Sequence, residues 1–507
     1  MNANLFARLR PALAADPARP VMNWRGSWIT AGEILDRAGR IAAHLRDLGL
    51  EPGDRIAVQV EKSPENVALY LGALQAGAIY LPLNTGYTLS ELDYFIGDAE
   101  PRVIVCDPAK EPGLAPIAEK AGARLTTLDA EGRGRLADGA DAAGPAPEIS
   151  AATDDDIAAI LYTSGTTGRS KGAMLSHGNL WSNARALIEA WEFTADDVLI
   201  HALPIFHTHG LFVALNVTFA TGTRLHFLPK FDADEVLRLM PESTVMMGVP
   251  TFYSRLLAHP GLTREATSRM RLFISGSAPL LAETHRAFTD RTGQAILERY
   301  GMTETGMNIS NPLHGERRPG AVGLPLPGVE VRITDDEGRP LPPGETGNIE
   351  IRGPNVFKGY WRMPEKTASE FRPDGFFITG DLGTMSEDGY FTIVGRAKDL
   401  IISGGYNVYP KEVEDVLNAL PGVAESAVIG VPHADFGEAV VAAIVLEPGA
   451  DASEIEDAVR AATGESLAAY KRPKKIVFTD AFPRNTMGKV QKNLLRETCR
   501  DLFSDPT

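Results

Sequence analysis

Two hydrophobic periods alternate along most of the chain. Apolar residues recur every three or four positions in segments such as Ala31–Leu48 and Pro64–Gln75, which predicts helices. Short apolar runs between them, such as Asp54–Val60 and Val103–Cys106, predict buried strands. Because helices and strands alternate up to residue 400, we expect a layered α/β architecture with largely parallel sheets. Residues 127–156 are rich in Ala, Gly and Asp and are expected to form a surface connection.

The last part of the chain has the same two periods over a shorter length. Two segments have helical periodicity and three have strand character: Lys411–Leu420, Ser453–Ala462, Ala424–Val431, Val440–Leu446 and Lys475–Thr479. About 110 residues of this kind suit a compact α+β domain. A β-rich unit, Val329–Arg352, lies before them. The sequence therefore predicts a large N-terminal domain of layered α/β subdomains with a β-rich subdomain, and a small, mobile α+β C-terminal domain.

Composition narrows the class of protein. The chain has 50 basic and 66 acidic residues, and its net charge of −16 argues against a nucleic-acid surface. Two cysteines, Cys106 and Cys499, indicate a reducing compartment and not a disulfide scaffold. The most apolar stretch, Val67–Leu83, is interrupted by Gln75 and Gly77, and the N-terminus lacks a signal-like apolar core. We therefore expect a cytoplasmic protein that does not contact a membrane.

The first candidate site is the loop T-S-G-T-T-G-R-S-K-G at residues 163–172. It follows the strand-like Ile157–Tyr162 and precedes the helix-like His177–Ala190, an arrangement that can hold phosphate. Glycines let the backbone approach a ligand closely, while hydroxyl groups and one lysine supply donors. The predicted ligand-binding positions are Thr163, Ser164, Gly165, Thr166, Thr167, Gly168 and Lys171. The spacing does not fit the G-x-x-x-x-G-K-[ST] phosphate loop.

Seven further motifs follow this loop in order. They are P-I-F-H-T-H-G (Pro204–Gly210), S-G-S-A-P-L (Ser275–Leu280), Y-G-M-T-E-T (Tyr300–Thr305), T-G-D (Thr379–Asp381), G-R-A-K-D (Gly395–Asp399), G-G-Y-N-V-Y-P (Gly404–Pro410) and P-R-N-T-M-G-K (Pro483–Lys489). With the loop, they resemble the adenylate-forming superfamily, which includes acyl-CoA synthetases, peptide-synthetase adenylation domains and firefly-type luciferases. The resemblance covers essentially the whole chain.

The resemblance implies a domain organisation and a set of cofactors. Residues 1–397 would form an adenylation domain, and residues 400–507 a lid domain that alternates between two half-reactions. Lys398 and Asp399 would form the hinge between them. The implied ligands are ATP, Mg²⁺ and, as co-substrate, coenzyme A.

The resemblance also implies roles for nucleotide-binding residues. Glu304 would bind Mg²⁺ together with Thr166, since Mg²⁺ prefers oxygen ligands. Thr303 would contact the α-phosphate, and Tyr300 would pack on the adenine. Asp381 and Arg396 would hold the ribose. Further nucleotide-binding positions are Gly276, Ser277, Ala278, Glu298, Arg299, Gly301 and Met302.

Two other segments would serve the chemistry itself. Lys489 is a compact cation that would carry the first half-reaction, where charge builds at the α-phosphate. His207, in the P-I-F-H-T-H-G motif, is a second catalytic candidate beside Glu304. Gly404 and Gly405 would leave bare backbone for the pantetheine arm of coenzyme A.

The expected acid pocket contains polar residues, which argues against a long fatty acid. Arg286 lies one position off the helical stripe Leu281, His285 and Phe288, from which it can reach back toward the S-G-S-A-P loop. This pattern is similar to that of malonyl-CoA synthetases, in which the corresponding arginine binds the distal carboxylate. Malonate is therefore the expected substrate, with methylmalonate as a possible second one. The predicted lining is Arg286, Thr208, Met307 and Ser277.

Several alternatives remain open from the sequence. The chain could activate another short carboxylic acid, load a carrier protein, act as a luciferase-like oxygenase, or bind a nucleotide without catalysis. The segment Pro483–Lys489 also resembles a site of reversible acetylation in bacterial acyl-CoA synthetases. A lysine acetyltransferase and a deacetylase acting on Lys489 are therefore expected partners, beside the small dicarboxylate substrate.

Overall fold

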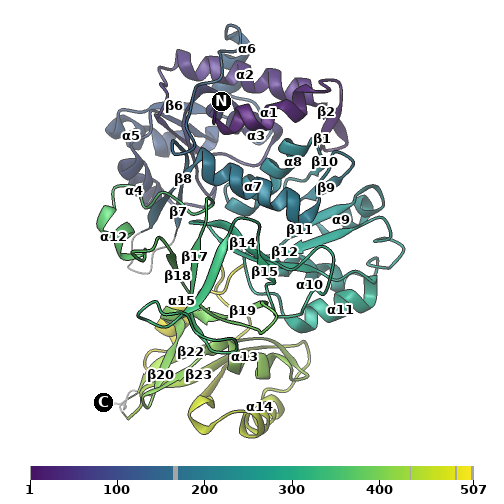
Figure 1. Ribbon diagram of the computed structural model, residues 1–507, viewed down its shortest axis with the longest axis vertical. Coiled ribbons are helices and arrows are strands. Elements are labelled where there is room, and N and C mark those ends of the chain that lie inside the picture. Colours follow the sequence, from purple (N-terminus) through teal and green to yellow (C-terminus); the bar gives the residue numbers. More distant parts are fainter. Residues whose placement is uncertain (1, 164–169, 434, 486–487, 504–507) are drawn as a thin grey trace.

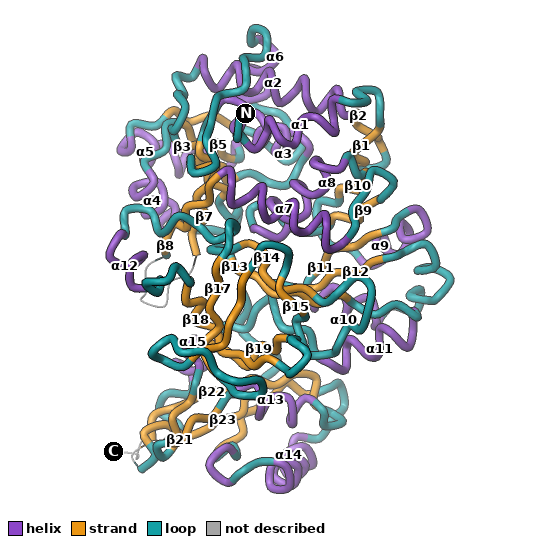
Figure 2. The backbone as a smooth tube through the Cα atoms, viewed as in Figure 1, coloured by secondary structure: helices purple, strands orange, loops and turns teal. Residues whose placement is uncertain are grey.

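The computed structural model describes residues 2–163, 170–433, 435–485 and 488–503. Figure 1 shows a large part that begins with α1 (Leu5–Ala14) near the top, and a small C-terminal part below it. In Figure 2 the strands in the upper half of the large part form two groups, one around β3, β5 and β7 and one around β1, β9 and β10, with helices beside both groups. Among the described helices, none combines the length and the apolar character that a membrane span requires.

The first sheet has the strand order β6-β5-β3-β4-β7-β8, with all pairs parallel except β7 and β8. Its strands are β3 (Arg55–Gln59), β4 (Ile79–Pro82), β5 (Val103–Cys106), β6 (Arg124–Thr127), β7 (Ile157–Thr163) and β8 (Lys171–Ser176). The helices around it are α2 (Ala31–Asp47), α3 (Pro64–Ala76), α4 (Leu89–Ala99), α5 (Glu111–Ala121) and α6 (Arg135–Ala142). One apolar core lies under α4 and α5, and a second joins α2 and α3 to the next sheet.

Helix α3 illustrates how local sequence sets the ends of an element. The Ser63 side chain accepts a hydrogen bond from the backbone N–H of Asn66, and Pro64 occupies the first turn, where no backbone donor is needed. Gly77, at φ +86°, adopts the left-handed conformation that ends the helix. Residues 66–76 are all buried because α1, α2 and β4 surround the helix.

The second sheet has nine strands in the order β15-β14-β13-β12-β11-β9-β10-β1-β2. Its strands are β1 (Pro20–Trp24), β2 (Ser27–Thr30), β9 (Val198–His201), β10 (Arg224–Phe227), β11 (Val245–Gly248), β12 (Leu272–Ser275), β13 (Leu297–Met302), β14 (Gly306–Ser310) and β15 (Leu324–Pro325). The nearby helices are α7 (His177–Trp191), the π-helix η2 (His209–Leu215), α8 (Asn216–Thr221), α9 (Ala233–Leu239), α10 (Pro250–Ala258) and α11 (Ala282–Thr292). β9 to β13 run parallel, so their carboxyl ends meet at one edge.

The third and fourth sheets complete the chain. The third is antiparallel and contains β16 (Glu330–Thr334), β17 (Gly347–Arg352), β18 (Phe377–Met385) and β19 (Phe391–Arg396), with α12 (Pro364–Ser369) beside it. The C-terminal part contains β20 (Ile401–Ser403), β21 (Tyr406–Val408), α13 (Pro410–Asn418), β22 (Val423–His433), β23 (Gly437–Leu446), α14 (Ala452–Ser466), β24 (Lys475–Phe478) and α15 (Lys492–Thr498). The predicted mixed α/β class, with a large and a small part, is confirmed.

Two local predictions were wrong. Residues 127–156 contain the helix α6, which packs on α2 through the buried Leu136 and Ala140. The candidate phosphate loop does not lead directly into a helix. It joins two antiparallel strands, with Thr163 of β7 opposite Lys171 of β8, and α7 begins only after β8.

Candidate active site

The predicted nucleotide residues come together where three sheets meet. Thr163 ends β7, Glu304 lies in the turn between β13 and β14, and Asp381 and Arg396 lie on β18 and β19. Figure 1 shows these strands converging in the middle of the molecule, above the small part. Ser164, Gly165, Thr166, Thr167 and Gly168 of the loop lie outside the described residues.

Glu304 is the buried carboxylate of this region. Its Oε1 atom lies 3.1 Å from the hydroxyl of Tyr360 and 3.5 Å from the hydroxyl of Thr163. Burial raises the pKa of Glu304, although the charges of Lys171 and Arg396 act in the opposite direction. A carboxylate oxygen beside hydroxyl donors and basic side chains is a suitable ligand for a hard divalent cation.

Tyr300, Asp381 and Arg396 form one hydrogen-bonded unit. The hydroxyl of Tyr300 donates to Asp381 Oδ2 at 2.5 Å, and Arg396 Nε lies 2.7 Å from Asp381 Oδ1. The strand register places Asp381 directly opposite Arg396 on the neighbouring strand. Burial acts to lower the pKa of Arg396, but the charges of Asp381, Tyr300 and Glu304 raise it. The Asp381 carboxylate is therefore held in place between the Tyr300 hydroxyl and the Arg396 guanidinium. Two more of the predicted nucleotide positions lie close by: Met302 ends β13, and Thr303 lies in the turn that follows.

Lys489 reaches this unit from the small part. Its backbone N–H donates to Asn485 Oδ1 at 2.9 Å, and its backbone oxygen accepts from the N–H of Asn485 at 3.0 Å, which closes a tight turn. Burial lowers the pKa of Lys489 and the charge of Arg396 acts in the same direction, while Asp381 and Asp399 oppose them. Lys489 as a whole residue is nevertheless exposed to solvent.

The predicted hinge lies near Lys489. Lys398 and Asp399 fall in a short 3₁₀ turn, Ala397–Asp399, which directly follows β19. Asp399 Oδ1 lies 2.7 Å from Arg496 Nη2 on α15. Gly404 and Gly405 form the turn between β20 and β21, at φ +59° and +83°.

A second group of polar residues surrounds the S-G-S-A-P loop after β12. Arg299 is 3% exposed, and within the described chain its Nε and Nη2 atoms have no hydrogen-bond partner. Its guanidinium lies against Gly276, where a Cβ atom would come within 2.3 Å of Arg299 Cζ. Burial lowers the pKa of Arg299 to about 9, so the side chain is still a cation at neutral pH.

Ser277 and the P-I-F-H-T-H-G motif complete this group. Ser277 has φ +70°, a conformation that non-glycine residues rarely adopt. Its Oγ lies 3.3 Å from His209 Nδ1, and the backbone N–H of His209 donates to His207 Nδ1 at 3.3 Å. Burial lowers the pKa of His207 to about 4, and the charge of Arg299 adds to this effect. Both histidines are therefore neutral at pH 7.

Thr208 and Met307, two of the predicted pocket residues, lie on neighbouring segments: Thr208 between His207 and His209, and Met307 on β14. Thr208 is buried, and within the described chain its hydroxyl has no partner. Met307 is opposite Gly301 in the register of β13 and β14, and its Cε packs close to Gly301. Ala278 follows Ser277 in the same loop.

Arg286 is not brought to this group. It lies on α11, whose stripe of His285 and Phe288 is buried as predicted, but Arg286 itself is exposed to solvent. The role of Arg286 in binding the distal carboxylate stays a prediction. Arg299 was predicted only as a nucleotide-binding residue. It follows Glu298 in β13, and both charged side chains are buried there.

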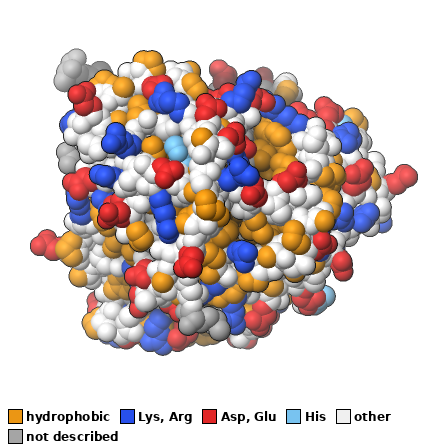
Figure 3. All heavy atoms as spheres, turned by 90° about the horizontal axis from the view of Figure 1, so that it is seen from above, with side chains coloured by type: hydrophobic (Ala, Val, Ile, Leu, Met, Phe, Trp, Pro, Cys, Tyr) orange, Lys and Arg blue, Asp and Glu red, His pale blue; other side chains and the backbone are white. Residues whose placement is uncertain are grey.

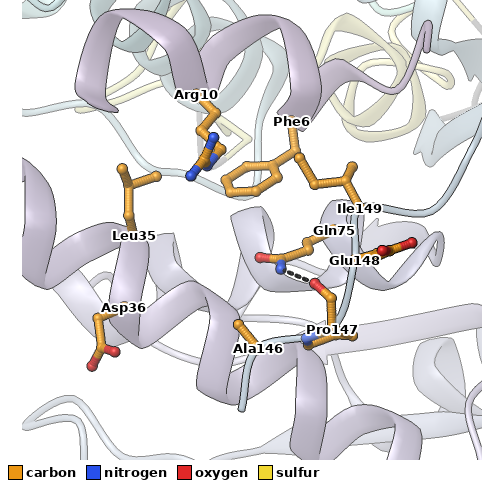
Figure 4. Close-up of a pocket in the computed structure, with 9 residues that line it drawn as sticks. All are labelled: Phe6, Arg10, Leu35, Asp36, Gln75, Ala146, Pro147, Glu148 and Ile149. Carbon is orange, nitrogen blue, oxygen red and sulfur yellow. Dashed lines mark hydrogen bonds between the residues drawn. The ribbon is translucent and has the colours of Figure 1, made fainter. Parts of the chain in front are cut away.

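A separate hollow lies at the opposite end of the large part. Figure 3 shows this face from above, with acidic and basic side chains intermixed around exposed hydrophobic ones. The cavity there has a volume of about 550 Å³. Figure 4 shows Phe6, Leu35 and Ile149 around it, with Arg10 pointing into it. None of the predicted site residues lines this cavity, so it is not part of the candidate active site.

Comparison with known proteins places these residues in a family. The profile described as "AMP-binding enzyme" matches residues 9–361, and that of "AMP-binding enzyme C-terminal domain" matches residues 412–489. A feruloyl-CoA synthase of Amycolatopsis is 38% identical over 93% of this chain and 94% of its own length. A malonate–CoA ligase of Arabidopsis thaliana is 36% identical over 88% of this chain and 78% of its own length.

The solved structures include a much more similar protein. The ATP-bound structure of MatB from Rhodopseudomonas palustris is 60% identical, covers 99% of this chain and 100% of its own, and superposes with a TM-score of 0.97. The apo structure of the same protein has the same identity and coverage but a TM-score of 0.85. Because these two structures share one sequence, the difference reflects conformation, and the present structure has the arrangement of the ATP-bound one. The chain belongs to the AMP-binding enzyme family.

Proposed function

We propose that the chain is an ATP-dependent ligase that joins malonate to coenzyme A. In the first step a malonate carboxylate attacks the α-phosphate of ATP, which gives malonyl-adenylate and pyrophosphate. In the second step the thiol of coenzyme A loses its proton and attacks the acyl carbon, and AMP leaves. The family match, the likeness to MatB and the malonate–CoA ligase relative support the reaction. The pocket around Arg299 supports the choice of acid.

The observation that carries this choice is the buried Arg299, whose Nε and Nη2 atoms have no hydrogen-bond partner among the described residues. A buried cation whose donors lack partners is costly, and a carboxylate that reaches it recovers part of that cost. A guanidinium can clasp one carboxylate with two parallel hydrogen bonds. Ser277 and His209 lie beside it and offer further polar contacts. In this proposal Arg299, and not Arg286, binds the distal carboxylate of malonate.

The first step depends on residues around the candidate nucleotide site. Lys489 supplies positive charge where the attacking carboxylate and the α-phosphate meet. Asp381 and Arg396 hold the ribose, Tyr300 borders the adenine, and Thr303 lies near the α-phosphate. Mg²⁺, when bound by Glu304 with Thr166 of the loop, would neutralise phosphate charge.

The second step requires the small C-terminal part to rotate relative to the large part. Lys398 and Asp399 would act as the hinge that carries Lys489 away from the candidate nucleotide site. The same rotation would bring Gly404 and Gly405 to that site, where their bare backbone leaves room for pantetheine. This assignment of the hinge and of the domain limits at residues 397 and 400 rests on the family pattern.

A panel of acids tests the proposal. CoA-dependent AMP formation would be measured with malonate, methylmalonate, acetate, octanoate and ferulate. Arg299→Met removes the charge at similar length and should lower kcat/KM for malonate by about a hundredfold, equivalent to roughly 3 kcal/mol, with a smaller loss for acetate. Arg286→Met makes the same chemical change on the exposed face of α11 and should stay within about twofold of wild type.

The ratio between acids decides the outcome, because it is insensitive to the fraction of folded enzyme. An unchanged ratio of malonate to acetate in Arg299→Met would remove Arg299 from the pocket. A collapse of that ratio in Arg286→Met would restore the sequence-based assignment. Preference of the wild type for ferulate or octanoate would reject malonate as the substrate.

We also propose that acetylation of Lys489 switches the first step off. The residue is exposed to solvent, and acetylation would remove its charge. A lysine acetyltransferase and a deacetylase would be the partners of this switch. Mass spectrometry of the modified peptide, paired with pyrophosphate exchange, tests it, and full exchange activity at complete acetylation would refute it.

A further inference from the structure

Lys171, Tyr360 and Glu370 form a charged cluster at the end of the candidate phosphate loop. Lys171 begins β8, and Glu370 directly follows α12. Lys171 Nζ lies 3.2 Å from Glu370 Oε1 and 4.1 Å from the centre of the Tyr360 ring. The two charged side chains are 9% and 18% exposed, so water screens their attraction only weakly.

Glu370 is held by two groups besides Lys171. Lys366 Nζ lies 2.6 Å from Glu370 Oε1, and the hydroxyl of Tyr360 donates to Glu370 Oε2 at 2.6 Å. Burial acts to raise the pKa of Glu370, but Lys366, Tyr360 and Lys171 together lower it. The carboxylate is therefore ionised at neutral pH, and it stays anchored when Lys171 moves.

Tyr360 connects this cluster to the candidate metal ligand. Its hydroxyl lies 3.1 Å from Glu304 Oε1, as well as 2.6 Å from Glu370. A hydroxyl has one proton, and the shorter distance favours Glu370 as its acceptor. A backbone hydrogen bond also holds the neighbouring residues together, since the N–H of Trp361 donates to the oxygen of Gly172 at 2.7 Å. Lys171 and Glu370 therefore face each other across a rigid junction.

We propose that Glu370 competes with pyrophosphate for Lys171, and so weakens pyrophosphate binding and favours its release after adenylation. This inference rests on the proposed function, which produces pyrophosphate beside the loop. The ammonium of Lys171 is a compact charge on a flexible stem, so it can pair with a carboxylate or with a phosphate. A phosphate that recruits Lys171 must break or share the pair with Glu370. The free energy lost with the Glu370 ion pair therefore reduces the affinity of the site for pyrophosphate.

Titration calorimetry with inorganic pyrophosphate and Mg²⁺ tests the competition. Glu370→Gln removes the charge but keeps the side-chain shape, and it should lower the Kd for pyrophosphate by about three- to tenfold. Glu365→Gln makes the same change at an exposed position of α12 and should stay within about twofold of wild type. AMP contains no β- or γ-phosphate, so its Kd should be unchanged in both variants and serves as the control for folding.

An unchanged or higher Kd for pyrophosphate in Glu370→Gln, with normal AMP binding, would overturn the proposal. An equal fall in the Kd for pyrophosphate in Glu365→Gln would also overturn the proposal, because the loss of any negative charge on this part of the surface would then explain the effect. Malonate-dependent pyrophosphate exchange by the wild type separates this result from the proposed function. Absence of exchange with every acid rejects the proposed function, whereas the Kd comparison concerns Glu370 alone.

Discussion

At the scale of single residues, the candidate acid pocket is built at a cost in folding free energy. Ser277 has a left-handed backbone, which costs a non-glycine residue roughly 1–2 kcal/mol. Arg299 keeps two donors without partners in the described chain, each worth about 1–3 kcal/mol when left unpaired. Such costs persist where a site needs a preformed geometry. A bound dicarboxylate would recover part of them.

The buried Glu298 should make the free energy of unfolding depend on pH. Burial raises its pKa to about 7, from 4.5, so the folded chain binds a proton more tightly than the unfolded chain. The free energy of unfolding should therefore fall as pH rises from about 4.5 to 7, by roughly 3 kcal/mol from this group. Glu298→Gln keeps an acceptor for the N–H of Leu280 and should lack this fall.

The measurement is chemical denaturation of both proteins between pH 5 and 8. The difference in unfolding free energy between variant and wild type should favour the variant increasingly toward pH 8. Glu283→Gln, at an exposed position of α11, is the control and should show no such trend. A difference for Glu298→Gln that does not vary with pH would contradict the assignment of a raised pKa.

Sequence reasoning located many of these residues but not all their neighbours. Glu304, Asp381 and Arg396 were found because their short motifs are unusual, and the fold brings them together from three sheets. The exposure of Arg286 was not foreseen, because helical periodicity shows which positions share a face, but not which cavity that face meets. The burial of Arg299 against Gly276 depends on packing between β13 and the S-G-S-A-P loop, which no local pattern encodes.

At the scale of elements, the helices and strands followed their sequence patterns closely. α3 and β5 have the predicted bounds to within one residue, since apolar runs and capping residues mark them. β8 was missed because Lys171–Ser176 is short and follows a loop rich in glycine. Its pairing with β7 is a tertiary contact that periodicity does not reveal.

The β20–β21 hairpin offers a prediction at this scale. A Cβ atom at Gly405 would meet no atom within 4 Å, so Gly405→Leu should fit sterically but project into the proposed pantetheine path. Thioester formation from preformed malonyl-adenylate should fall at least about tenfold, while pyrophosphate exchange should change little. Single-turnover assays of the two half-reactions provide the measurement.

Gly449→Leu is the matched control, because Gly449 has φ +89° and equally open space, but lies in another turn of the small part. It imposes the same backbone strain and should leave both half-reactions near wild type. Equal loss of thioester formation in both variants would mean that strain, and not obstruction, is responsible.

At the scale of the whole molecule, the arrangement of the two parts matches the ATP-bound state of MatB better than its apo state. The ion pair between Asp399 and Arg496 joins the predicted hinge to α15 in this arrangement. We expect Arg496→Ala to destabilise this arrangement of the two parts. Adenylation should slow by about two- to fivefold, which corresponds to the free energy contributed by a partly exposed ion pair. Thioester formation from preformed malonyl-adenylate should not slow.

Rapid-quench measurement of each half-reaction would check this shift. Arg500→Ala, an exposed position just beyond α15, is the control and should leave both rates near wild type. Equal slowing of the two steps by Arg496→Ala would indicate general damage to the small part and would contradict a role in the arrangement of the two parts.

The register of β18 and β19 limits where residues can be inserted into or deleted from this hairpin. Asp381 faces Arg396, and the hinge turn begins at the very next residue, so no spacer separates the nucleotide site from the pivot. An insertion or deletion of one residue within β19 would turn Arg396 to the other side of the sheet and displace the pivot at once. The turn at residues 386–390 has an exposed Glu387 and Asp388, and it can absorb extra residues without moving either. Evolution can therefore lengthen this hairpin at its tip, whereas the strand that leads out of it must keep its number of residues.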